Sequence, residues 1–284
     1  MGIDGVKPQG FLRTIISEAR LRETQRRAST LDPFKITPNL RTYLISLFSL
    51  HRPASMLDRA ILILRAAIAP SETFEVNGRS FPGLSLAQKG LQIQLNDDFN
   101  HLLREKGSGY LLPDQLLAAT RTNRVALCAE FSFLLVTLLR TAKIESFVKI
   151  TSKHAYVLAK IEGKLYKIDA TLPVTFKEVP VSTEISSDDD ARFWYFAASS
   201  GIMVHQNRIE QAIEYAQCAL LIREDANLLA SLARLYNWRN SGSTVEQQRD
   251  RQRGMEILRR AISLDPQNQR AQRAMSEIYP DAAQ

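Results

Sequence analysis

The chain has 284 residues, 45% hydrophobic and 24% charged, a balance typical of a folded protein with a sizeable core. No stretch approaches the roughly 20 uninterrupted apolar residues that span a bilayer, and the first residues lack the pattern of a secretory signal. The net charge of +7 would suit an anionic partner, yet no zinc-finger, P-loop, dinucleotide or helix-turn-helix motif accompanies it. We therefore expect a cytoplasmic protein without a membrane span and without a nucleic-acid partner.

The N-terminal part of the sequence predicts a helical scaffold. Residues 1–35 are expected to form a basic arm and helix, since arginines alternate there with acidic residues. Apolar residues recur at helical spacing from Pro38 and again after Pro53, and Leu84–Leu103 has a similar pattern. Between them, an Asn-Gly pair within Glu75–Gly83 predicts a small hairpin.

The centre of the chain predicts a buried helix followed by a sheet. Ala129–Arg140 is apolar on most of its circumference, which is typical of a helix packed on several sides. Three β-prone segments follow, and the last two are separated by a Glu-Gly turn at 162 and 163. These segments are Ser146–Thr151, His154–Ile161 and Lys164–Ile168. A central helix that leads into an antiparallel sheet predicts an α+β fold.

The two cysteines fall in different predicted domains, so no disulfide is expected between them. Cys218 lies among apolar residues of a helix, where a thiol is usually inert. Cys128 lies at the start of the buried helix, where the positive end of the helix dipole would lower the pKa of the thiol. Cys128 is therefore the candidate nucleophile.

His154 and Asp169 are predicted to lie close together. A two-residue turn at 162 and 163 places His154 opposite Thr171, with Asp169 as a diagonal neighbour on the same face. A slight change of the turn, or one bulge, would align them directly. An aspartate beside a histidine fixes the imidazole tautomer and stabilises its protonated form, so Cys128, His154 and Asp169 could act as nucleophile, base and orienting group.

The motifs that begin at Cys128, His154 and Ile168 resemble, in order and spacing, the core of transglutaminase-like proteins. The resemblance covers about residues 110–175, within a domain expected to span 36–200. It implies a papain-like core with a Cys-His-Asp triad, which needs no metal or organic cofactor. It also implies transamidation, deamidation, peptide hydrolysis or another acyl transfer on a protein, peptide or carrier-bound acyl substrate.

Two details near the cysteine bear on that resemblance. Members of the family often carry glycine two positions before the nucleophile, where this chain has Ala126. The backbone N–H of Cys128 is one expected donor to the oxyanion, and Asn123 and Gln115 are the candidates for the second donor.

The C-terminal part, residues 201–284, predicts an all-helical domain that begins near Gly201. The polar stretch Phe176–Ala191 before it is expected to be closed onto the core by the aromatic run Phe193–Phe196. Two later segments align with each other, and Ala261–Asn268 resembles the end of a tetratricopeptide repeat. That resemblance implies a groove for a protein partner.

Two alternatives to a transglutaminase-like hydrolase or transamidase remain. One is a catalytically inactive adaptor that binds proteins, and the other is an acyltransferase that takes its acyl group from a carrier-bound thioester.

Overall fold

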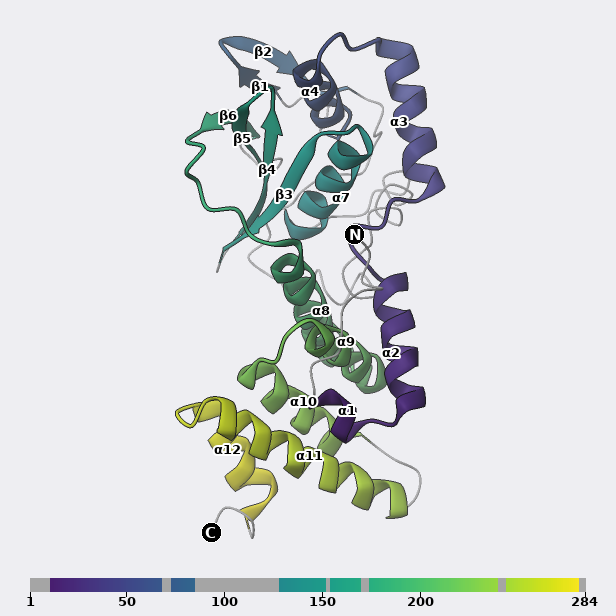
Figure 1. The fold of residues 1–284 in the computed structure, drawn as a ribbon, viewed down its shortest axis with the longest axis vertical. Helices are drawn as coiled ribbons and strands as arrows, with labels where there is room; N and C mark the ends of the chain where they lie inside the picture. The colour runs from purple at the N-terminus through teal and green to yellow at the C-terminus, as the bar shows by residue number, and fades with distance from the viewer. Residues whose placement is uncertain are drawn as a thin grey trace. The chain divides into compact units, whose positions relative to one another are not determined.

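The computed structural model describes residues 11–67, 73–84, 128–151, 154–169, 174–239 and 244–280. These residues form helices and antiparallel sheets, so the fold is of the α+β type (Figure 1). Within the described ranges, one compact unit contains residues 32–191 and the other contains 11–31 together with 192–280. No helix in these ranges is long and apolar enough to cross a membrane.

A four-stranded antiparallel sheet forms the β part of the unit at 32–191. Its strands follow the chain order: β3 (Glu145–Ile150), β4 (Ala155–Ile161), β5 (Lys164–Asp169) and β6 (Thr175–Val179). The predicted strands correspond to β3, β4 and β5 within a residue or two. β6 was not predicted, since it lies in the stretch expected to be a polar connection. Its alternation is weak, because Phe176 is its one fully buried residue and the following Lys177 and Glu178 are exposed.

The helix α7 (Cys128–Thr141) packs against β3 and β4 of this sheet, and α3 and α4 also contact it (Figure 1). Every residue from Ala129 to Leu139 is buried. Leu134, Leu135 and Leu139 are among the largest fully buried side chains of the described chain. The prediction of a helix buried on most sides is confirmed.

The remaining elements of this unit are α3 (Pro38–His51), α4 (Met56–Ala67) and the hairpin β1 (Thr73–Val76) to β2 (Arg79–Pro82). Thr37 caps α3, because its hydroxyl accepts a hydrogen bond from the Leu40 N–H. The predicted hairpin is present, and its Asn-Gly turn has positive φ at both residues, 50° and 76°, as a tight two-residue turn requires. The helix predicted for Leu84–Leu103 falls outside the described residues, apart from Leu84 itself.

The second unit is helical in all its described elements. It contains α1 (Leu12–Ile15), α2 (Glu18–Thr30), α8 (Asp188–His205), α9 (Ile209–Ile222), α10 (Ala226–Trp238), α11 (Thr244–Leu264) and α12 (Gln269–Ile278), with the start of α8 assigned to the first unit. Contacts join α10 to α9, α11 and α12, and α2 to α9. The division between units falls after Ala191 rather than near Gly201, which lies inside α8. The aromatic run therefore lies within a long helix, and Tyr195 and Phe196 are completely buried.

Replacing Leu139 with alanine tests the role of α7 in stability. Leu139 is fully buried, so Leu139→Ala is expected to lower the free energy of unfolding by about 2–5 kcal/mol through lost burial and a cavity. Leu50 on α3 is 67% exposed, and Leu50→Ala should change the same free energy by less than about 0.5 kcal/mol. Urea denaturation of the two variants measures the difference, and equal losses would contradict the central role of α7.

Candidate functional site

Cys128 is the first residue of α7 and is partly buried. The backbone N–H of Ala155, the first residue of β4, lies near enough to the sulfur to lower the pKa of the thiol. Its own carbonyl accepts a hydrogen bond of 2.8 Å from the Ser132 hydroxyl one turn further along the helix. The thiol therefore lies at the start of α7 and near the start of β4. The first residue of β4, Ala155, directly follows His154 in the sequence.

The surroundings of Cys128 raise the pKa of its thiol, contrary to the prediction from its place at a helix start. Burial has the largest effect, because it removes water from the charged form. The N–H groups of Ala155 and Ala129 act in the opposite direction, and the negative charge of Asp169 raises the pKa further. Because the charge of Asp169 acts on the thiol, this carboxylate lies in the neighbourhood of the sulfur.

His154 and Asp169 are joined by a hydrogen bond of 2.8 Å between the imidazole Nε2 and Oδ2 of the carboxylate. The predicted hairpin register is confirmed, since Ile161 pairs with Lys164 and Val157 with Ile168. In this register the two residues are diagonal neighbours on one face, and their side chains meet without a bulge. Thr171, the expected partner directly opposite His154, lies outside the described residues.

Thr151 holds the backbone of His154 through hydrogen bonds. The Thr151 hydroxyl donates to the His154 carbonyl at 2.9 Å and accepts from the His154 N–H at 3.0 Å. The Thr151 N–H donates to the same carbonyl at 2.8 Å. Three hydrogen bonds thus fix where the histidine enters β4, and the ring direction follows from the bond to Asp169.

Lys167 and Tyr156 belong to the same cluster and were not predicted from the sequence. The Lys167 ammonium lies 3.8 Å from Oδ2 of Asp169 and 4.2 Å from the centre of the Tyr156 ring. The Tyr156 ring is in turn adjacent to the His154 imidazole, with 6.4 Å between ring centres. Tyr156 lies two residues from His154, and Lys167 lies two residues from Asp169, so all four side chains lie on one face of the sheet. The hairpin register was therefore the sequence signal from which Lys167 and Tyr156 could have been predicted.

Gln115 and Asn123, the candidates for the second oxyanion donor, lie outside the described residues, as does Ala126. Within the described ranges, no group of His, Cys, Asp and Glu is arranged to hold a metal ion. The structure thus places His154 in contact with Asp169, and it places Cys128 near enough to Asp169 for the carboxylate charge to act on the thiol. A thiol, an imidazole and a carboxylate are the groups that nucleophilic catalysis by cysteine uses.

Comparison with known proteins finds no matching family and no matching curated protein. A comparison of folds aligns the chain with a solved structure described as "Crystal structure of menin reveals the binding site for Mixed Lineage Leukemia (MLL) protein". The alignment covers 93% of this chain and 66% of that chain, with 13% sequence identity and a TM-score of 0.39. This chain therefore spans slightly less than two thirds of the menin chain, and a likeness of this degree assigns neither a family nor an activity.

The two cysteines provide a direct test of the geometry. Cys218 is completely buried, and burial raises the pKa of its thiol to about 12, whereas Cys128 is partly exposed. In the native protein at pH 8, a limiting alkylating reagent is expected to label Cys128 at least about tenfold faster than Cys218, since the reagent attacks the thiolate. Peptide mass mapping measures both rates, and equal labelling would contradict the described burial.

Proposed function

We propose that the chain is a cysteine-dependent acyl-transfer enzyme with a transglutaminase-like, papain-like core. The single observation that carries the proposal is the 2.8 Å bond between His154 and Asp169, whose carboxylate charge acts on the thiol of Cys128. The resemblance of the three linked sequence motifs to transglutaminase-like proteins supports it. The substrate class is a carboxamide, a peptide or a carrier-bound thioester, and the acceptor is water or an amine.

The proposed reaction begins with transfer of the Cys128 proton to the imidazole. Because Asp169 accepts from Nε2–H, it fixes the neutral tautomer in which Nδ1 carries the lone pair that takes this proton. The thiolate sulfur then attacks the carbonyl carbon, and a carbon–sulfur bond forms. His154 returns the proton to the leaving amine or thiol as its bond to the carbonyl carbon breaks.

The second half of the reaction releases the acyl group. Water or an amine attacks the carbonyl carbon of the thioester and gives its proton to His154. The carbon–sulfur bond breaks, and the proton moves back to the sulfur of Cys128. Asp169 stabilises the imidazolium in both halves because its negative charge lies in hydrogen-bond contact with the ring.

A catalytically inactive scaffold is the second candidate, and the pKa of Cys128 favours it. Burial raises that pKa, so the thiol without a cationic neighbour would be mostly protonated and unreactive at neutral pH. The enzyme proposal requires the imidazolium of His154 to overcome this effect by pairing with the thiolate. The two candidates therefore predict different pH profiles for the reactivity of one sulfur atom.

Alkylation of Cys128 across pH tests the proposal, with His154→Ala as the decisive variant. The wild-type rate is expected to show a plateau below pH 7, because a thiolate–imidazolium pair exists there. His154→Ala removes the pair, so the rate should fall about tenfold or more at neutral pH and rise only above pH 9, following the raised pKa of the lone thiol.

The matched control is His51→Ala, which removes an exposed imidazole from the end of α3 in the same unit. It should leave the whole Cys128 profile unchanged. A wild-type rate that rises only above pH 9 and is indifferent to His154 would refute the enzyme proposal and support the inactive scaffold.

Asp169→Asn separates the orienting role of the carboxylate from its charge. The asparagine oxygen keeps an acceptor for Nε2–H, but it no longer stabilises the imidazolium, so the low-pH plateau of Cys128 alkylation should shrink. Activity in a general assay, the incorporation of a fluorescent primary amine into glutamine-containing peptides, should fall roughly 10²–10⁴-fold. Circular dichroism of the variant checks that the sheet is intact, and an unchanged plateau would contradict the proposed ion pair.

A further inference from the structure

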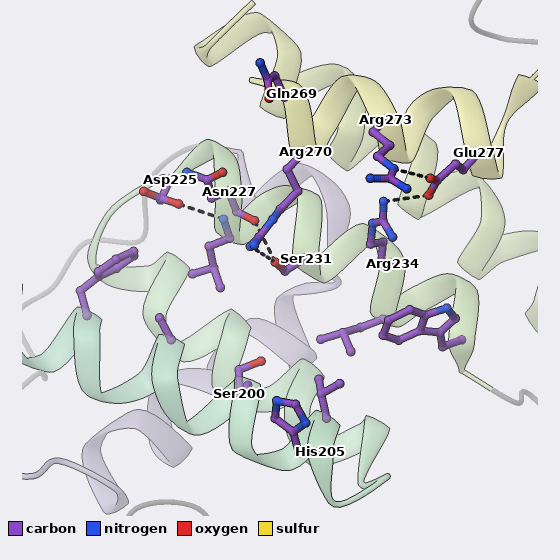
Figure 2. Close-up of a pocket in the computed structure, with 17 residues that line it drawn as sticks. Ser200, His205, Asp225, Asn227, Ser231, Arg234, Gln269, Arg270, Arg273 and Glu277 are labelled. Atoms are coloured by element: carbon purple, nitrogen blue, oxygen red, sulfur yellow. Dashed lines mark hydrogen bonds and ion pairs between the residues drawn. The ribbon is translucent and has the colours of Figure 1, made fainter. Parts of the chain in front are cut away.

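A groove with a volume of about 1030 Å³ lies within the helical unit, lined by α8, α10 and α12 (Figure 2). All of its lining residues fall between 193 and 277, so it belongs to this unit alone. The volume is at the upper end of the roughly 300–1,000 Å³ typical of small-molecule pockets. A groove formed by every second helix of a stack is the kind of surface on which helical-repeat proteins bind extended peptides.

Apolar side chains form part of the groove wall. Trp238, at the end of α10, is 52% exposed, although most of α10 is buried. Leu228 and Leu235 on the same helix and Val204 on α8 also line the groove. An exposed tryptophan beside buried leucines gives an anchoring position for an apolar side chain of a bound partner.

Arginines dominate the charged part of the groove. Glu277 accepts from Nη2 of Arg234 at 2.9 Å and from Nε of Arg273 at 2.6 Å, as Figure 2 shows. The hydrogen bond from Arg273, supported by Arg234, lowers the pKa of Glu277, so this carboxylate stays charged. One carboxylate is therefore shared by two arginines, and this part of the groove keeps an excess positive charge.

Arg270 lies in the same groove without a carboxylate partner among the described residues. It extends from α12 toward α10 in Figure 2. There its Nη1 donates to the Ser231 hydroxyl over 3.4 Å, which is a long and weak hydrogen bond. The other carboxylate of the groove, Asp225, caps α10 through its Oδ1, which accepts from the Leu228 N–H, and no ion pair joins it to Arg270. The guanidinium of Arg270 is thus positioned to bind an anionic group that the chain itself does not supply.

We propose that this groove binds an acidic peptide segment of a partner protein, with a carboxylate on Arg270 and an apolar side chain against Trp238. Charge complementarity selects the acidic residue, and the exposed tryptophan selects an apolar neighbour. A nucleic acid would use the arginines but not this apolar wall. The proposal goes beyond acyl transfer and is tested by binding without turnover, so its failure would leave the proposal for Cys128 intact.

The test is fluorescence anisotropy with short dye-labelled peptides in which aspartate and glutamate alternate with leucine, titrated with the full chain. A second peptide carries asparagine and glutamine in place of the acids. The acidic peptide should bind at least about tenfold more tightly than its neutral counterpart, since hydrogen bonds to charged groups contribute that much to affinity. Equal binding of the two peptides would overturn the proposal.

Arg270→Glu is the decisive variant, and Arg249→Glu is its matched control. Arg270→Glu should weaken binding of the acidic peptide about tenfold or more, because the reversed charge repels the carboxylate. Arg249 is exposed on α11 and does not line the groove, so the same change of net charge there should alter affinity by less than about twofold. Equal losses in the two variants would show binding by overall charge and overturn the assigned groove.

Two further measurements separate a peptide from other occupants. Trp238→Ala should weaken binding of the acidic peptide several-fold, and because this tryptophan is exposed, its replacement should leave the helical unit folded. A labelled DNA duplex is titrated in parallel with the wild-type chain and Arg270→Glu. A duplex that binds more tightly than the peptide, and loses its affinity in Arg270→Glu, would overturn the peptide assignment in favour of nucleic acid.

Discussion

The helix α7 is enclosed by protein along its length, and it carries Cys128 at one end and Arg140 near the other. Arg140 forms a two-pronged ion pair with Asp188 at 2.7 and 2.8 Å, donates to the Ser146 carbonyl, and lies 4.7 Å from the centre of the Phe34 ring. Paired geometry of this kind restrains a helix in both position and rotation. The position of Cys128 is consequently set by the packing of the whole helix.

The β4–β5 hairpin sets the other half of the site. Glu162 and Gly163 both adopt positive φ, 53° and 81°, which is the geometry of a two-residue turn between twisted strands. The turn fixes the register, and a slip by one residue would move Asp169 to the opposite face, away from His154. A local turn thus determines a contact between side chains fifteen residues apart.

Local patterns explain which features could be predicted. The hairpin register and the diagonal contact of His154 with Asp169 follow from turn chemistry and strand alternation, which are readable from short segments. β6 was not predicted because its only buried residue, Phe176, is followed by the exposed Lys177 and Glu178, which leaves no clear alternation of apolar and polar residues. Its pairing with β5 is a tertiary interaction. The direction of the pKa shift at Cys128 was predicted wrongly, because the helix start is visible in the sequence, whereas the burial that outweighs it depends on residues distant in the chain.

The electrostatics of the site rest on a balance in which Asp169 has two opposing effects. Its negative charge acts directly on Cys128 and disfavours the thiolate, in the same direction as burial. In the proposed reaction, the same carboxylate would also stabilise the imidazolium that forms when His154 takes the proton of Cys128, through the bond to Nε2. The backbone hydrogen bonds between Thr151 and His154 and the register of the hairpin fix where the imidazole lies relative to Asp169. The balance between the two effects of Asp169 therefore depends on the placement of a single ring.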